Sequence, residues 1–198
     1  GQILDPTTDL DAVNQAIGQG DVQVTPLQVA TFMAAIANGG TLYRPQIVES
    51  IQPIECDPLI VYKPEARGTL PLRSENLDIL RDALIMVTQN TRGTATYNLR
   101  GLQFKVAGKT GTAESGNGLA HAWFTGYTLN EVNTSLPDIA IAVIVENIGE
   151  GSDYAVPIFR AMVETYYYGS PQTRPSFGPI GQPPYTPTPF GAPTQKDN

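Results

Sequence analysis

The chain has 198 residues, of which 41% are hydrophobic, and it carries a formal net charge of −7. This length can bury one core, while the acidic balance and the lack of clustered Lys and Arg exclude a surface that collects nucleic-acid phosphates. The only cysteine, Cys56, cannot form an internal disulfide, and without a Cys- or His-rich spacing we expect no metal or other cofactor.

The first predicted helix begins near Thr25. Thr25 can cap it, Pro26 suits the first helical position, and Gln28 completes a capping box. Apolar residues on most sides of the segment 27–37 predict a buried helix. The sequence Asn38-Gly39-Gly40 ends it.

An extended segment is predicted at 41–48, where Pro45 restricts it to an edge or irregular strand. We expect loops from there to about Leu72. A second helix is predicted from an N-cap at Ser74 to about Gln89. Its buried stripe has helical spacing and consists of Leu77, Leu80, Leu84 and Val87.

The pattern changes to extended chain from Gln103 onward. Short connections favour one antiparallel sheet, with strands at 104–106, 109–113, 122–127 and 139–145. The last of these lacks polar alternation, so we expect a central strand covered on both faces. The order of elements predicts an α+β fold with an antiparallel sheet flanked by helices.

A last helix is predicted with Ser152 or Asp153 as its cap and Pro157 in an early turn, running through Tyr166. The composition then shifts, because eight of the 17 prolines follow Ser170. We therefore expect a folded domain at 1–169 and a disordered tail at 170–198. A ligand for a proline-binding partner is the alternative interpretation of the tail.

Chemically active residues are concentrated in Val-Ala-Gly-Lys-Thr-Gly-Thr-Ala-Glu at 106–114. Lys109 can hold a carboxylate or a proton network near a nucleophile, and Thr110 and Thr112 offer hydroxyl donors. Gly111 lets a ligand backbone lie close to the strand and pair with its free amides. The Thr112 amide can donate to a developing oxyanion. An exposed edge strand with a lysine that opposes aggregation would also explain the Lys-Thr-Gly tripeptide.

An ordered set of segments surrounds this tripeptide and is more specific than the tripeptide itself. The segments are Gly18-Gln19-Gly20, Val24-Thr25-Pro26-Leu27-Gln28, Ala34-Ala35-Ile36-Ala37-Asn38-Gly39-Gly40, Arg44-Pro45, Gly93-Thr94-Ala95, Gly108 to Ala113 and His121-Ala122-Trp123-Phe124. In this order the chain resembles class B penicillin-binding proteins from about Ile17 to about Tyr168.

The resemblance implies the transpeptidase fold shared by penicillin-binding proteins and serine β-lactamases. It also implies a D,D-transpeptidase that cross-links peptidoglycan stem peptides and is acylated by β-lactam antibiotics. Residue by residue, it assigns substrate binding to Lys109, Thr110, Gly111 and Thr112, and a catalytic part to Lys109 and Thr112. The amide of Thr112 would serve the oxyanion and its hydroxyl a carboxylate.

The resemblance also implies a place on the extracytoplasmic face of the bacterial plasma membrane. No run in this chain approaches the ~18 apolar residues that span a bilayer, so we expect the anchor in an upstream segment. The Gly-Gln-Gly and Ala-Asn-Gly-Gly stretches lean toward a parent that serves wall elongation and cell shape, and leave division open.

The family mechanism needs an SxxK serine, an SxN motif and the KTG strand, and only the last is present. No serine has a lysine three positions later. Ser74-Glu75-Asn76 and Ser115-Gly116-Asn117 match SxN by letter, but we interpret them as a helix cap and a turn. We expect the chain to be a fragment whose partner is the upstream serine-bearing half of the domain.

The only histidine, His121, invites a general-base role, but without a nucleophile beside it we interpret it as a packing residue near the cleft. The first functional hypothesis is therefore an enzyme fragment, inactive by itself. The alternatives are a non-catalytic binding or structural module that kept the fold, and a protein that hydrolyses or senses β-lactams.

Overall fold

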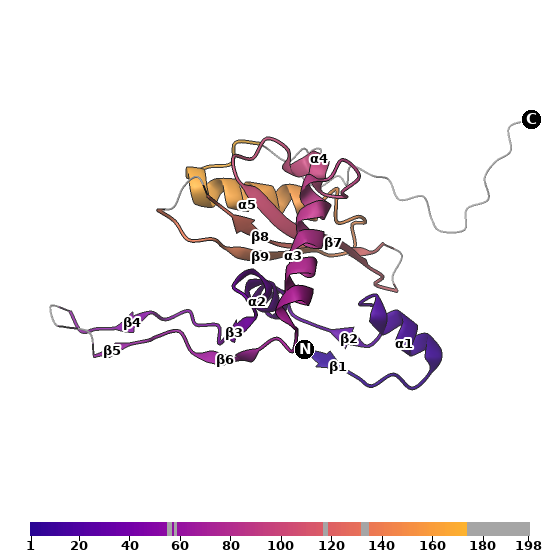
Figure 1. The fold of residues 1–198 in the computed structure, drawn as a ribbon, viewed down its shortest axis with the longest axis horizontal. Coiled ribbons are helices and arrows are strands. Elements are labelled where there is room, and N and C mark those ends of the chain that lie inside the picture. Colours follow the sequence, from indigo (N-terminus) through magenta and orange to yellow (C-terminus); the bar gives the residue numbers. More distant parts are fainter. Residues whose placement is uncertain (55–56, 58, 117–118, 132–134, 174–198) are drawn as a thin grey trace, which may run out of the picture.

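The computed structural model describes residues 1–54, 57, 59–116, 119–131 and 135–173 (Figure 1). Cys56, Asn117 and the tail from residue 174 onward lie outside the described residues. None of the described helices combines the length and the apolar character needed to cross a membrane. The elements, in chain order, are β1 (Gln2–Ile3), α1 (Asp9–Ala16), β2 (Val22–Gln23), α2 (Pro26–Ala37), β3 (Thr41–Tyr43), β4 (Ser50–Ile51), β5 (Ile60–Val61), β6 (Ala66–Thr69), α3 (Ser74–Gln89), α4 (Thr96–Leu99), β7 (Lys105–Ala113), β8 (His121–Leu129), β9 (Ala140–Val145) and α5 (Ala155–Tyr168).

The main sheet has the order β7-β8-β9, and both pairings are antiparallel, as the sequence predicted. The segments 104–106 and 109–113, predicted as separate strands, belong to the single strand β7. The prediction of a central strand at 139–145 was wrong in part. β9 lies at one edge of the described sheet and β8 in the middle, although α2 and α5 both contact β9. Apolar residues on both faces of a strand indicate that helices cover both faces. They do not indicate how many strands lie beside it.

Helices cover the two faces of this sheet, with α5 on one side and α2 and α3 on the other (Figure 1). Alternation along β7 sends Val106 into the core under α5 and Ala107 into the core under α2 and α3. On the α5 side the rings of Phe124 and Phe159 meet edge to face, with centroids 4.8 Å apart. These two cores hold β7 between the helix layers.

The start of α2 confirms the sequence prediction in detail. The Thr25 hydroxyl accepts from the Gln28 N–H at 3.2 Å, and the Gln28 side chain accepts from the Thr25 N–H at 2.9 Å. The prediction of general burial holds for the face that carries Met33 and Ile36. It is wrong for Leu27, which is 62% exposed because α2 packs against the sheet on one side only.

The caps predicted for the other two long helices were wrong. Arg73 occupies the N-cap of α3, and its carbonyl accepts from the N–H of Asn76 and of Leu77, so Ser74 is already helical. Tyr154 occupies the N-cap of α5 in place of Ser152 or Asp153. Neither cap uses a side-chain hydrogen bond. The predicted end of α3 at Gln89 is confirmed, as is its stripe, in which Leu77 and Leu84 are buried.

The expected loop up to Leu72 contains paired strands. β3 pairs with β6 and β4 with β5, and together they form an antiparallel ribbon that projects from the rest of the molecule (Figure 1). Two short helices, α1 and α4, were also not predicted. The signal for α1 was a capping box between Thr8 and Asp11.

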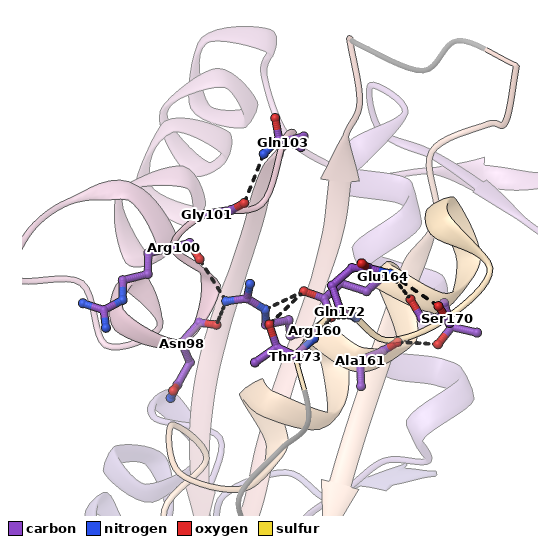
Figure 2. A network of polar contacts seen from close by, with 11 residues as sticks. Asn98, Arg100, Gly101, Gln103, Arg160, Ala161, Glu164, Ser170, Gln172 and Thr173 are labelled. Atoms are coloured by element: carbon purple, nitrogen blue, oxygen red, sulfur yellow. Dashed lines mark hydrogen bonds and ion pairs between the residues drawn. The ribbon is translucent and has the colours of Figure 1, made fainter.

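A buried ion pair ties α5 to α4 and to the end of the described chain (Figure 2). Arg160 Nε donates to Glu164 Oε1 at 2.7 Å, and the Arg160 guanidinium also donates to the carbonyls of Asn98 and Arg100. The N–H groups of Gln172 and Thr173 donate to Glu164 Oε2 at 2.7 and 2.9 Å. Residues 170–173 thus contact the domain, while the tail expected at 170–198 otherwise lies outside the described residues and stays a prediction.

Candidate functional site

The second half of β7, from Lys109 to Thr112, lies at an open edge of the main sheet, because β8 is the only strand that pairs with β7 among the described residues. The carbonyl of Thr112 accepts a side-chain bond from outside the sheet, so it points away from β8. The N–H and C=O of one strand residue point to the same side, and the direction alternates along the strand. The N–H groups of Thr110 and Thr112 therefore face the outer edge as well.

Lys109 is exposed, and its ammonium lies along this outer edge. Nζ donates to the main-chain carbonyl of Thr110 at 2.7 Å. Gly111 lies opposite Trp123 in the ladder, and an added Cβ would make a tight contact, 3.2 Å from Trp123 Cβ. The strand thus presents a cation and main-chain groups side by side.

The Thr110 hydroxyl lies 2.8 Å from the hydroxyl of Thr94. Thr94 stands in the turn between α3 and α4, which is held by main-chain bonds from Gly93 N–H to the Asn90 carbonyl and from Ala95 N–H to the Val87 carbonyl. The segment Gly93-Thr94-Ala95 was noted only for its resemblance to a family. The structure places it beside the Lys-Thr-Gly strand.

The Thr112 hydroxyl donates to Glu150 Oε2 at 2.7 Å. Glu150 belongs to the turn between β9 and α5. No sequence pattern indicated it, because a single acidic residue in a glycine turn has no spacing to detect. It is the functional candidate that reasoning from sequence missed outright.

Gln19 closes the far end of the edge. Its side-chain amide donates to the Thr112 carbonyl at 3.0 Å and accepts from the Glu114 N–H at 3.3 Å, as a neighbouring strand would. The Gly18-Gln19-Gly20 segment is therefore attached to β7 across 93 residues of sequence. Two of the segments noted for their order thus contact a third, the Lys-Thr-Gly strand.

Other candidate residues have structural partners. His121 is the first residue of β8, and its Nδ1 accepts from the Asn147 N–H at 3.0 Å. Ser74 stands in the first turn of α3, and the Ser115 hydroxyl donates to the Leu119 carbonyl at 2.7 Å. The described residues contain no group of three or more His, Cys, Asp or Glu that could hold a metal.

A cavity of about 440 Å³ lies at the opposite end of β7, between the end of α3 and α4. Its lining includes Thr88, Arg100 and Lys105 and none of the residues from Lys109 to Thr112. We assign the candidate site to the edge strand all the same, because the convergent hydroxyls, cation and free amide are there. Such a strand forms one wall of a site whose other wall must come from outside it.

Comparison with known proteins agrees with this arrangement. The family model described as "Penicillin binding protein transpeptidase domain" matches residues 2–164. Peptidoglycan D,D-transpeptidase PbpA of Mycolicibacterium smegmatis is 36% identical over 170 residues, which cover 80% of this chain and 32% of the relative. Peptidoglycan D,D-transpeptidase MrdA of Haemophilus influenzae is 28% identical over 184 residues, covering 81% of this chain and 26% of the relative.

Among solved structures, penicillin-binding protein A from M. tuberculosis, as its imipenem acyl-enzyme complex, superposes with a TM-score of 0.67 at 27% identity. The alignment covers 81% of this chain and 34% of that one. The chain therefore spans about a quarter to a third of the length of these proteins. This similarity confirms the predicted α+β fold.

Proposed function

The chain belongs to the penicillin-binding protein transpeptidase family, and from this premise we propose that it supplies the KTG wall of a serine D,D-transpeptidase active site. The complete domain would cross-link peptidoglycan stem peptides by acyl transfer and would be acylated by β-lactams. One observation carries the proposal. The outer edge of β7 holds the Lys109 ammonium, the Thr110 hydroxyl and the Thr112 amide within four residues of strand.

The position of each group supports a specific role in the reaction. Lys109 supplies positive charge to the reacting end of the ligand and to the proton network of the serine. The Thr110 hydroxyl donates to the ligand, and Gly111 keeps the strand free of a side chain at its centre. The Thr112 N–H, directed outward, donates to the oxyanion that forms when the serine attacks the acyl carbon.

The short open stretch of the edge fits an extended ligand. Gln19 occupies the Thr112 carbonyl and the Glu114 N–H, while the Thr88 hydroxyl donates to the Val106 carbonyl at the other end. A peptide pairing with β7 is thereby confined to the residues around Thr110 and Thr112. A stem peptide offers such a backbone, and pairing by strand addition would orient its scissile bond.

The partner that completes this site is the upstream, serine-bearing half of the domain. The chain lacks an SxxK serine, and it spans about a quarter to a third of the length of its relatives. Two other surfaces of the chain can contact a neighbouring chain. The far edge of β9 has no partner strand among the described residues, and on α2 the side chains of Leu27 and Phe32 are 62% and 42% exposed. We place the complete protein on the extracytoplasmic face of the bacterial plasma membrane, where peptidoglycan is cross-linked.

Labelling with a fluorescent penicillin tests the proposal. The chain is incubated with the reagent by itself and together with its upstream half, and covalent labelling is measured on a denaturing gel. We expect labelling of the serine-bearing half in the pair and none of this chain alone. The absence of labelling in the pair, with both halves folded, would contradict the proposal and favour a non-catalytic binding module.

A further inference from the structure

The ribbon formed by β3, β4, β5 and β6 exposes many large apolar side chains. It projects from the rest of the molecule (Figure 1), and none of its described residues within 44–65 belongs to either buried core. Large apolar side chains gathered on one exposed element indicate an interaction surface. The exposed apolar residues are Tyr43, Ile47, Val48, Ile51, Ile54, Leu59, Ile60, Val61 and Tyr62.

The outer part of the ribbon, β4 and β5, has too few strands to be stable by itself. Each strand has two residues, and among the described residues each pairs only with the other. A two-stranded hairpin is at best marginally stable in water and needs a third strand or a packed partner. The Tyr62 N–H donates to the Glu49 carbonyl at 2.8 Å within the hairpin. Because the direction alternates along a strand, the main-chain groups of Val61 face the free edge of β5.

The charges beside β5 are arranged symmetrically about Ile60. Asp57 precedes Ile60 by three residues and Lys63 follows it by three; both are exposed, and neither forms an ion pair among the described residues. When two identical strands pair antiparallel around Ile60, Asp57 of each copy lies opposite Lys63 of the other. Leu59 of each copy then lies opposite Val61 of the other. Since opposite charges in cross-strand pairs are stabilising, the β5 edge complements itself.

Other ways of covering the ribbon fit its charges less well. The β4 side, residues 47–54, includes Glu49 and no cation, so two copies paired there would bring like charges together. A lipid surface is also a poor fit. Segments that lie on membranes carry Lys and Arg beside their apolar residues, whereas Asp57, in the turn between β4 and β5, is acidic.

We propose that a second copy of this chain docks on the ribbon, with β5 of one copy antiparallel to β5 of the other around a two-fold axis at Ile60. The two hairpins then form one larger sheet, which removes the free edge of each. Apolar side chains of both copies meet at the axis, and an Asp57–Lys63 pair lies on either side of it. This inference does not rest on the proposed function, because the ribbon and the KTG edge share no residue.

Sedimentation velocity of the complete protein, measured from about 1 to 100 μM, tests the proposal. We expect a shift from monomer to dimer as the concentration rises. Asp57→Lys and Lys63→Asp each place like charges opposite one another on both sides of the axis, so each should weaken the dimer about tenfold. The double variant Asp57→Lys/Lys63→Asp again pairs opposite charges and should restore wild-type association.

A second pair of variants separates the β5 edge from general apolar association. Ile60→Lys places two like charges at the axis and should abolish the dimer over this concentration range. Ile47→Lys is the matched control, because Ile47 is a fully exposed isoleucine on the β4 side, and it should leave the dimer intact.

Three results would overturn the inference. They are a wild type that stays monomeric, equal weakening by Ile47→Lys and Ile60→Lys, and a double charge reversal that does not restore association. Labelling by the fluorescent penicillin is a separate measurement. Its failure would overturn the proposed function and leave the paired ribbons standing.

Discussion

The two halves of β7 differ in burial although they share the same partner strand. Val106 and Ala107 have no exposed surface, and the segment 106–108 is buried throughout. Lys109 and Thr112 are exposed, and Thr110 and Gly111 are half-buried. Backbone pairing with β8 continues without interruption across both halves. Hydrogen bonding within the ladder therefore holds the whole strand, and burial alone separates the residues that support it from those that can meet a ligand.

The outward-facing main-chain groups of the two halves of β7 have different kinds of hydrogen-bond partner. A buried hydroxyl, that of Thr88, binds the first half at the Val106 carbonyl. Longer side chains bind the second half, where Lys109 and Gln19 donate to successive outward carbonyls. The Thr88 hydroxyl also lies 3.0 Å from the Ile85 carbonyl. Being buried, it cannot exchange these partners for water, whereas an exposed long side chain can exchange its bond with a ligand or water. The second half is thus the part of the strand that can change partners.

The largest expected effect comes from the core beneath the first half. Phe124 is fully buried, and its ring lies under Gly108 and against Phe159. Phe124→Ala should lower the free energy of unfolding of the complete domain by about 3–5 kcal/mol, because it removes packed surface and leaves a cavity. Denaturant unfolding measures this change. Phe124→Leu keeps most of the volume and should cost clearly less; equal costs would mean that packing is not what fixes this half.

The next effect should appear in activity and not in stability. Lys109→Met keeps the length of the side chain and removes the charge, so acylation by a fluorescent penicillin should fall about 100-fold. The unfolding free energy should change by less than about 0.5 kcal/mol, since the residue is exposed. Lys105→Met is the matched control, because Lys105 is an exposed lysine on the same strand and the same face. A comparable loss of acylation in both variants would remove the distinction between the halves.

Local patterns predicted the parts of the fold that depend on short spacing. The capping box at Thr25, the stripe on α3 and the antiparallel strands were all visible in the sequence. The caps at Arg73 and Tyr154 were not, because no side-chain bond marks them. Nor was the edge position of β9, since the order of strands is decided by packing over the whole chain.

The candidate site also contains residues that the sequence could predict and residues that it could not. Lys109 to Thr112 could be found because the residues are consecutive and chemically distinctive. Thr94, Glu150 and Gln19 reach the same strand from turns that are 16, 38 and 93 residues away from their partners. Only folding brings such residues together, so no spacing in the sequence reports their contact. The resemblance to a family singled out the segments that contain Thr94 and Gln19, but it did not predict where they lie in the fold.

A third variant tests whether the buried polar cluster of Arg160 and Glu164 on α5 contributes to stability, as the buried half of β7 does. Burial disfavours ionisation of Glu164, yet the bonds from Arg160, Thr173 and Gln172 outweigh it and lower the pKa of its carboxyl. A lowered pKa means stability that is present above the unfolded pKa and is lost as the pH falls through the folded one. Glu164→Gln should therefore cost about 2–3 kcal/mol at neutral pH, because a buried charged pair is broken.

The cost of Glu164→Gln should shrink as the pH falls below about 4.3, the ordinary pKa of a glutamate, because the wild type then loses the same charge. Thermal unfolding at a series of pH values measures the difference. Glu65→Gln is the control, since Glu65 pairs with Arg44 at the surface and should cost less than about 0.5 kcal/mol at any pH. A pH-independent cost at Glu164 would show that its shape and not its charge matters.

The smallest expected effects come from two variants that compare the outer edges of the two halves of β7. Thr88→Val keeps the shape of a side chain that is 2% exposed and leaves the buried Val106 carbonyl without its donor, so it should cost about 1–2 kcal/mol of unfolding free energy. Gln19→Ala removes two bonds to the second half, but water can reach the freed Thr112 carbonyl and Glu114 N–H, so it should cost about 0.5 kcal/mol. Chemical denaturation of both variants under one condition measures the contrast. A cost at Gln19 as large as that at Thr88 would mean that the second half is closed to solvent, and a strand closed in this way has no free edge for a ligand to occupy.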